Sequence, residues 1–141
     1  MPARFNKMSI IPTSTSVNAA RDEWLALLSD LLADVERWAR NEGWDVRRDE
    51  KQIRERSLGG YTAHVLTIQT PRGRLMLEPV ARSVASGDGR VDLYAWPSLH
   101  RVWLVRRGDR WVPRTESAID WPKQWSQRTF VELASALTAA S

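Results

Sequence analysis

Residues 18–42 read NAARDEWLALLSDLLADVERWARNE, and this stretch decides how the rest of the chain must be arranged. Its large apolar side chains recur at alternating spacings of four and three residues, namely Trp24, Leu28, Leu31, Val35 and Trp38. That period predicts an α-helix, and a second apolar row beside the first makes the stripe broad enough to lie on a sheet. Burying the stripe is worth roughly 9–18 kcal/mol before entropy is subtracted, so the helix needs a partner surface.

Both ends of this helix carry signals of their own. Ser16 or Asn18 can cap the first turn, because each has a short side chain that accepts hydrogen bonds from free N–H groups. At the other end, Gly43 can adopt the left-handed conformation that terminates helices, and Trp44 would then fold back onto the last turn. We therefore expect the helix to begin near residue 18 and to end before Gly43.

After Gly43 the apolar period changes from about 3.6 to about 2, the period of a β-strand. Glycine-containing turns at 59–60, 70–73, 87–89 and 108–109 divide this region. Strands are predicted at 44–48, 53–58, 61–70, 74–82, 90–96, 101–107 and 110–112. Pro79 cannot donate to a ladder, so its strand should lie at a sheet edge or bend there.

The chain closes with a second, shorter helix. Thr129 and Glu132 have the spacing of a capping box, which places its start near Ser126 or Thr129. The predicted fold class is therefore α+β: a long N-terminal amphipathic helix packed on an antiparallel meander sheet of about six or seven strands, with a short C-terminal helix. We predict a flexible leader over residues 1–17 and a single domain over residues 18–141. Residues 9–11 of the leader could add an edge strand.

Composition excludes several classes of function. The absence of cysteine removes disulfides, thiol catalysis and thiolate metal sites. No apolar run of about 18 residues and no secretory signal are present, so we expect a soluble cytoplasmic protein with no membrane partner. The formal net charge of +4 is unevenly spread: residues 18–43 carry three arginines against six acids, whereas residues 44–115 carry fourteen basic residues against eight acids.

Glu78 and Asp92 are the acidic residues best placed to carry chemistry. If their hairpin pairs residue 78 with 94 and residue 80 with 92, then Glu78, Asp92 and Tyr94 share one face. Carboxylates on adjacent strands can hold Mg²⁺ in hydrolases and nucleases. Such a site usually needs a nearby lysine, and the chain has only Lys7, Lys51 and Lys123, all distant in sequence from these acids. The alternative is that both carboxylates pair with Arg82, Arg90 or Arg101. The two histidines, 36 residues apart, lack zinc-site spacing, and no cofactor is expected.

The eight tryptophans are the unusual feature of the composition. Five of them fall between residues 96 and 125, interleaved with arginines. The candidate interaction residues are Arg101, Trp103, Arg106, Arg107 and Trp111. This mixture can stack nucleobases on a basic sheet face, dominate a protein interface, or form a core with arginine stems packed over it. Acids at positions 92, 109, 116 and 120 interrupt the positive field, which favours a protein partner over nucleic acid.

We therefore expect a binding protein without catalytic activity that acts on another protein or on a second copy of itself. A nucleic-acid-binding module and a metal-dependent hydrolase or nuclease are the alternatives. Two helices can cover only about one face of a six-stranded sheet. Trp103 and Val105 point to the face opposite Val102 and Leu104, so apolar surface should remain there. Curling of the sheet, the leader or a second copy could cover it, and we favour the dimer.

Overall fold

The computed structural model describes residues 14–83 and 89–139, which form the α+β fold predicted from the sequence. Its elements are α1 (Ser14–Asn41), β1 (Asp45–Glu55), β2 (Gly59–Thr70), β3 (Gly73–Ala81), β4 (Arg90–Trp96), β5 (Arg101–Arg107), β6 (Arg110–Thr115) and α2 (Gln127–Ala139). The strands form one antiparallel sheet in the order β1-β2-β3-β4-β5-β6. The meander prediction is therefore confirmed.

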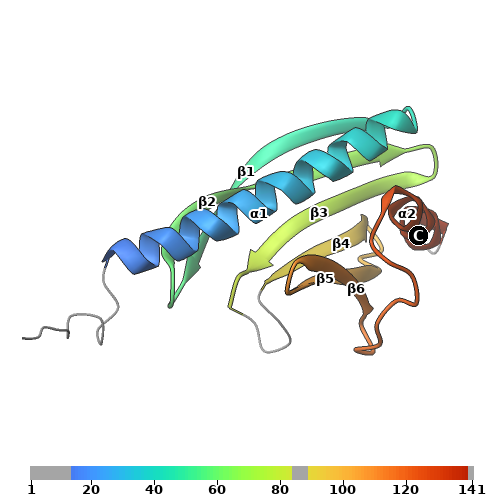
Figure 1. The fold of residues 1–141 in the computed structure, drawn as a ribbon. Coiled ribbons are helices and arrows are strands. Elements are labelled where there is room, and N and C mark those ends of the chain that lie inside the picture. Colours follow the sequence, from blue (N-terminus) through green and yellow to red (C-terminus); the bar gives the residue numbers. More distant parts are fainter. Residues whose placement is uncertain (1–13, 84–88, 140–141) are drawn as a thin grey trace, which may run out of the picture.

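Both helices pack on one face of a strongly curved sheet (Figure 1). The apolar stripe of α1 meets β1 and β2, and α2 lies against β3 and β4. The core between these layers centres on Trp24, which is fully buried and donates its indole N–H to the Tyr61 hydroxyl at 3.1 Å. We call the face with the helices the helix face and the opposite one the outer face. Neither helix offers a stretch long and apolar enough to traverse a bilayer within the described ranges.

Helix α1 begins four residues earlier than expected, at Ser14. Residues 16 and 18 thus lie inside the helix, and the prediction that one of them caps it is wrong. The expected strand at residues 9–11 falls outside the described part of the chain. The predicted C-terminus is confirmed, because Gly43 has φ +82° and its N–H donates to the Arg40 carbonyl at 2.9 Å. Trp44 N–H donates to the Ala39 carbonyl at 3.0 Å, which completes a Schellman motif.

The strands differ from prediction mainly in β1, and β6 also continues beyond its expected end at residue 112, to Thr115. Two short strands were expected over 44–48 and 53–58, but β1 is continuous and pairs with β2 along its whole length. Its middle residues are charged because β1 is an edge strand, where polar side chains are tolerated on both faces and discourage aggregation. Pro79 lies in an interior strand, and the expected irregularity is present as a register shift between Pro79 and Ala81.

Helix α2 starts at the earlier of the two predicted positions. The Ser126 hydroxyl accepts from the Thr129 N–H at 3.2 Å, so Ser126 is the cap. The predicted capping box of Thr129 and Glu132 is wrong. Thr129 is buried and donates its hydroxyl to the Gln124 carbonyl, and Glu132 instead pairs with Lys123 at 2.9 Å.

Candidate functional site

The register of β3, β4 and β5 brings several predicted site residues onto the outer face. Glu78 lies opposite Asp92, Asp92 opposite Trp103, and Tyr94 opposite Arg101. The predicted pairing of residue 78 with 94 is wrong by two positions. Because side chains alternate with a period of two, this error leaves the prediction of a shared face intact. Arg101, Trp103, Glu78, Asp92 and Tyr94 thus form one continuous surface.

Two of the other predicted interaction residues lie on the helix face, and the third lies on the outer face at the far end of β5. Trp111 is buried on the helix face, with its ring centroid 6.0 Å from that of Trp24. Arg106 lies opposite Trp111 and places its guanidinium 5.4 Å from the Trp111 ring centroid. Arg107 lies at the end of β5 and pairs with Asp120 at 2.7 Å. The five residues grouped by sequence proximity therefore belong to three environments.

The two carboxylates of the outer face are held by ion pairs and hydrogen bonds. Asp92, only 5% exposed, accepts from Arg90 at 2.7 and 3.1 Å and from Arg101 at 2.9 Å. Glu78 pairs with Lys51 of β1 at 2.8 Å and accepts from the Tyr94 hydroxyl at 2.7 Å. The expectation that no lysine lies nearby is therefore wrong.

Arg82 does not contribute its side chain to these pairs. Its main-chain N–H donates instead to the Glu55 carboxylate at 3.0 Å.

The ion pairs and hydrogen bonds of Glu78 and Asp92 occupy the carboxylate oxygens that proton transfer or metal binding would need. Burial alone would raise the pKa of Glu78, but hydrogen bonds from Lys51 and Tyr94 hold that pKa below its usual value. Glu78 therefore stays charged and paired. Among residues 14–83 and 89–139, no group of three or more metal-ligating acids or histidines comes together. The geometry matches the ion-pair alternative for Asp92, which pairs with Arg90 and Arg101. For Glu78 the expected arginine partner is wrong, because its ion pair is with Lys51.

The same network predicts an alkaline loss of stability. Burial, with the Glu78 carboxylate adding to it, raises the pKa of Tyr94 to about 12, and burial together with Glu55 raises the pKa of Tyr61. An unfolded tyrosine titrates near pH 10, so this stabilisation is complete below about pH 10 and is lost as the pH rises above it. We expect the free energy of unfolding, measured in urea, to fall between about pH 10 and 12, and to fall less in Tyr94→Phe.

The chain has two tyrosines, so tyrosinate absorbance gives a direct control. The folded protein should show little tyrosinate at about pH 10.5, whereas the urea-unfolded chain should show much more. If both tyrosines of the folded protein titrate near pH 10, the hydrogen-bonded network described for Tyr94 and Tyr61 is incorrect.

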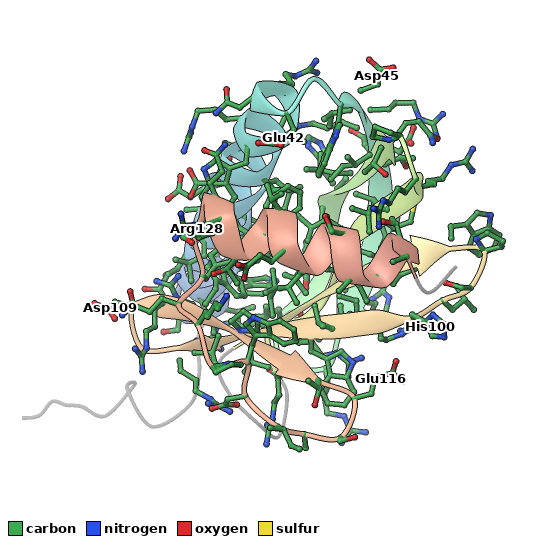
Figure 2. The ribbon with its side chains drawn as sticks, turned by 90° about the vertical axis from the view of Figure 1, so that its right-hand side faces the viewer. Glu42, Asp45, His100, Asp109, Glu116 and Arg128 are labelled. Atoms are coloured by element: carbon green, nitrogen blue, oxygen red, sulfur yellow. The ribbon has the colours of Figure 1, made fainter. Side chains whose placement is uncertain are left out.

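The sequence reasoning missed the most exposed part of this face. Trp96 and Leu99 are 50% and 43% exposed, and with Ile119 they are the exposed large apolar side chains of the described residues. Trp96 continues the outer face beyond Tyr94, opposite the exposed Arg74. Leu99 lies in the β4–β5 turn beside His100, which Figure 2 shows at the end of the sheet opposite Asp109. The alternation 92, 94, 96 along β4 was the available signal.

The apolar surface expected at Trp103 and Val105 is largely absent. Val105 is completely buried by the chain itself. Trp103 is half-buried, and the Arg90 guanidinium lies 4.1 Å from its ring centroid. The exposed apolar side chains in this region are instead Trp96 and Leu99. We use the name outer band for the outer-face residues Arg74, Met76, Tyr94, Trp96, Arg101 and Trp103 together with Leu99 of the adjoining β4–β5 turn.

The chain matches no family model, no curated protein and no solved structure. Inference about its function therefore starts from the outer band and from the remaining surface of the described residues.

Proposed function

We propose that this chain is a non-enzymatic binding protein whose outer band contacts another protein or a second copy of the chain. The observation that carries the proposal is the composition of a sheet face that neither helix covers. Apart from Leu99, the outer band consists of tryptophan, tyrosine, methionine and arginine, which are enriched in the centres of protein interfaces. Trp96 is the expected anchor, because it is a large ring that is half exposed in the free chain.

The arginines favour a protein partner over nucleic acid. Arg101 is held by Asp92, Arg107 by Asp120, and Arg106 donates to the Gly108 carbonyl at 3.1 Å. Phosphate groups would have to displace these partners before counterion release could contribute to affinity. The ring of Trp103 is covered by Arg90, so it does not offer an open stacking platform.

Site-specific photo-crosslinking tests the proposal. A photoreactive amino acid replaces Arg74, which is exposed beside Trp96, and in a matched variant it replaces Asp30, which is exposed on α1. In cells of the native host, we expect the probe at position 74 to give an adduct of defined mass and the probe at position 30 to give none. Adding Trp96→Ser should reduce the yield at position 74 by about tenfold, the loss expected for an interface anchor.

The mass of the adduct identifies the kind of partner. Twice the chain mass indicates self-association, and any other protein mass indicates a separate partner. An adduct shortened by nuclease would replace the proposal with the nucleic-acid alternative. Equal crosslinking from positions 74 and 30, or none from position 74, would contradict the outer band as an interface.

A further inference from the structure

A second surface feature lies at the open edge of the sheet, beside β6. It is a groove with a cavity of about 610 Å³, which is the size of a small-ligand or peptide site. One wall is β6 and the other is the segment 120–125, here called the strap. The aromatic and proline lining comprises Trp111, Pro113, Trp121, Pro122 and Trp125.

The strap is held at both ends by contacts with the rest of the fold, so the groove has a defined shape. Trp121 N–H donates to the Pro113 carbonyl at 2.8 Å, and Asp120 pairs with Arg107 at 2.7 Å. At the other end, the Trp125 ring packs edge-on against Trp38, with centroids 5.5 Å apart.

The main chain of Trp111 faces this groove. Arg106, its partner on β5, donates its N–H to the Gly89 carbonyl at 2.9 Å, away from β6. Arg106 and Trp111 therefore form a non-hydrogen-bonded pair, and the N–H and C=O of Trp111 point to the open edge. No partner for either group is present in the described residues.

The groove is rich in unused donors. The indole nitrogens of Trp121 and Trp125 are buried, and within the described ranges neither has a hydrogen-bond acceptor. Burying an N–H donor without an acceptor costs free energy, and a ligand carbonyl would recover it once a rotation of the indole on binding turns the nitrogen toward the groove. The Asp120 carboxylate, the nearest charged acceptor on the strap, is already taken by Arg107. The exposed Asp109 carboxylate and the Trp111 carbonyl are acceptors at the same groove and can remain hydrated. A complementary ligand should therefore offer acceptors to the indole donors.

We propose that the groove binds a proline-rich segment of another protein in the polyproline II conformation. Such a segment has no internal hydrogen bonds, so its carbonyls are free, and its prolines carry no N–H that would need an acceptor. Aromatic-lined grooves are a recurring site for this conformation. Addition of a β-strand fits less well, because the ladder cannot continue past Trp111: Pro113 has no N–H and its carbonyl is occupied. The proposal does not depend on the outer band.

The test is titration of the full chain with an acetylated, amidated decaproline peptide, followed by NMR and calorimetry. We expect the indole N–H resonances of Trp121 and Trp125 to shift downfield, and a glycine–serine peptide of equal length to have no effect. Trp121→Phe and Trp125→Phe each keep an aromatic ring but remove the donor. Each should weaken binding about five- to tenfold, as expected for one lost hydrogen bond.

Trp103→Phe is the matched control, because Trp103 also has a buried indole nitrogen without an acceptor but lies on the outer face. Its affinity for decaproline should equal that of the unmodified chain. The proposal is overturned if millimolar decaproline moves neither indole resonance of the unmodified chain, if the glycine–serine peptide binds equally well, or if both phenylalanine variants retain full affinity. The first two readouts use the unmodified chain, so a variant that folds poorly does not affect them.

Discussion

Gly89→Ala is expected to destabilise the fold by about 3 kcal/mol, because residue 89 has no room for a side chain. A Cβ atom there would lie 2.3 Å from Cζ3 and 2.6 Å from Cη2 of Trp24. Trp24 cannot yield easily, since it is fully buried, hydrogen-bonded to Tyr61 and packed against Trp111. The measurement is urea unfolding followed by circular dichroism.

Gly60→Ala is the matched control for this substitution. Its added Cβ would meet Arg54 at 3.6 Å, an ordinary van der Waals distance, and Arg54 is exposed and able to adjust. We expect a change within about 0.5 kcal/mol. If Gly89→Ala is as well tolerated as Gly60→Ala, the close approach of residue 89 to Trp24 is not a feature of the folded protein in solution.

The order of elements could be predicted from sequence because each depends on local signals. The apolar period that predicts α1 lies within the helix itself, and the glycine that ends the helix follows its last turn directly. The continuity of β1 could not be predicted in this way, since residues 49–51 are charged, Gln52 is polar, and the stretch has no alternation of apolar and polar side chains. Only pairing with β2 makes that stretch a strand. Tertiary pairing overrides local preference at a sheet edge.

The candidate site was predicted in part, for a geometric reason. Glu78, Asp92 and Tyr94 share a face despite a two-residue error, because that error preserves alternation. Trp103 and Trp111 were grouped although they lie on opposite faces. The β5–β6 hairpin pairs Arg107 with Arg110, so an odd-numbered residue of β5 shares its face with even-numbered residues of β6. The number of residues between two positions does not show this change from odd to even numbering across the hairpin.

The contact of Lys51 with Glu78 depends on where strands separate, which no local pattern specifies. Strand β2 pairs with β3 only over residues 66–70. Beyond that point the β1–β2 hairpin remains near the end of β3 through side chains: Lys51 reaches Glu78 and the Pro79 carbonyl, and Glu55 reaches the two residues after β3. The Glu55 contacts should therefore hold this part of the fold together.

Glu55→Gln is expected to lower the free energy of unfolding by about 2–3 kcal/mol. The buried Glu55 carboxylate accepts from the main-chain N–H groups of Arg82 and Ser83, each at 3.0 Å, and from the Tyr61 hydroxyl. Glutamine fills the same volume but turns one of the two acceptor oxygens into an NH₂ donor. That donor must then face an N–H group or the Tyr61 hydroxyl, so at least one charge-assisted hydrogen bond is lost and a buried donor is left without an acceptor.

Glu50→Gln on the same strand provides the comparison, because Glu50 is exposed and makes no ion pair within the described residues. Urea unfolding should place Glu50→Gln within about 0.5 kcal/mol of the unmodified chain. Hydrogen exchange should locate the effect of Glu55→Gln, with a larger increase in exchange rate at the Arg82 and Ser83 amides than at the amides of β3. Equal stability of the two variants, with unchanged exchange at residues 82 and 83, would mean that Glu55 does not join the β1–β2 hairpin to the end of β3.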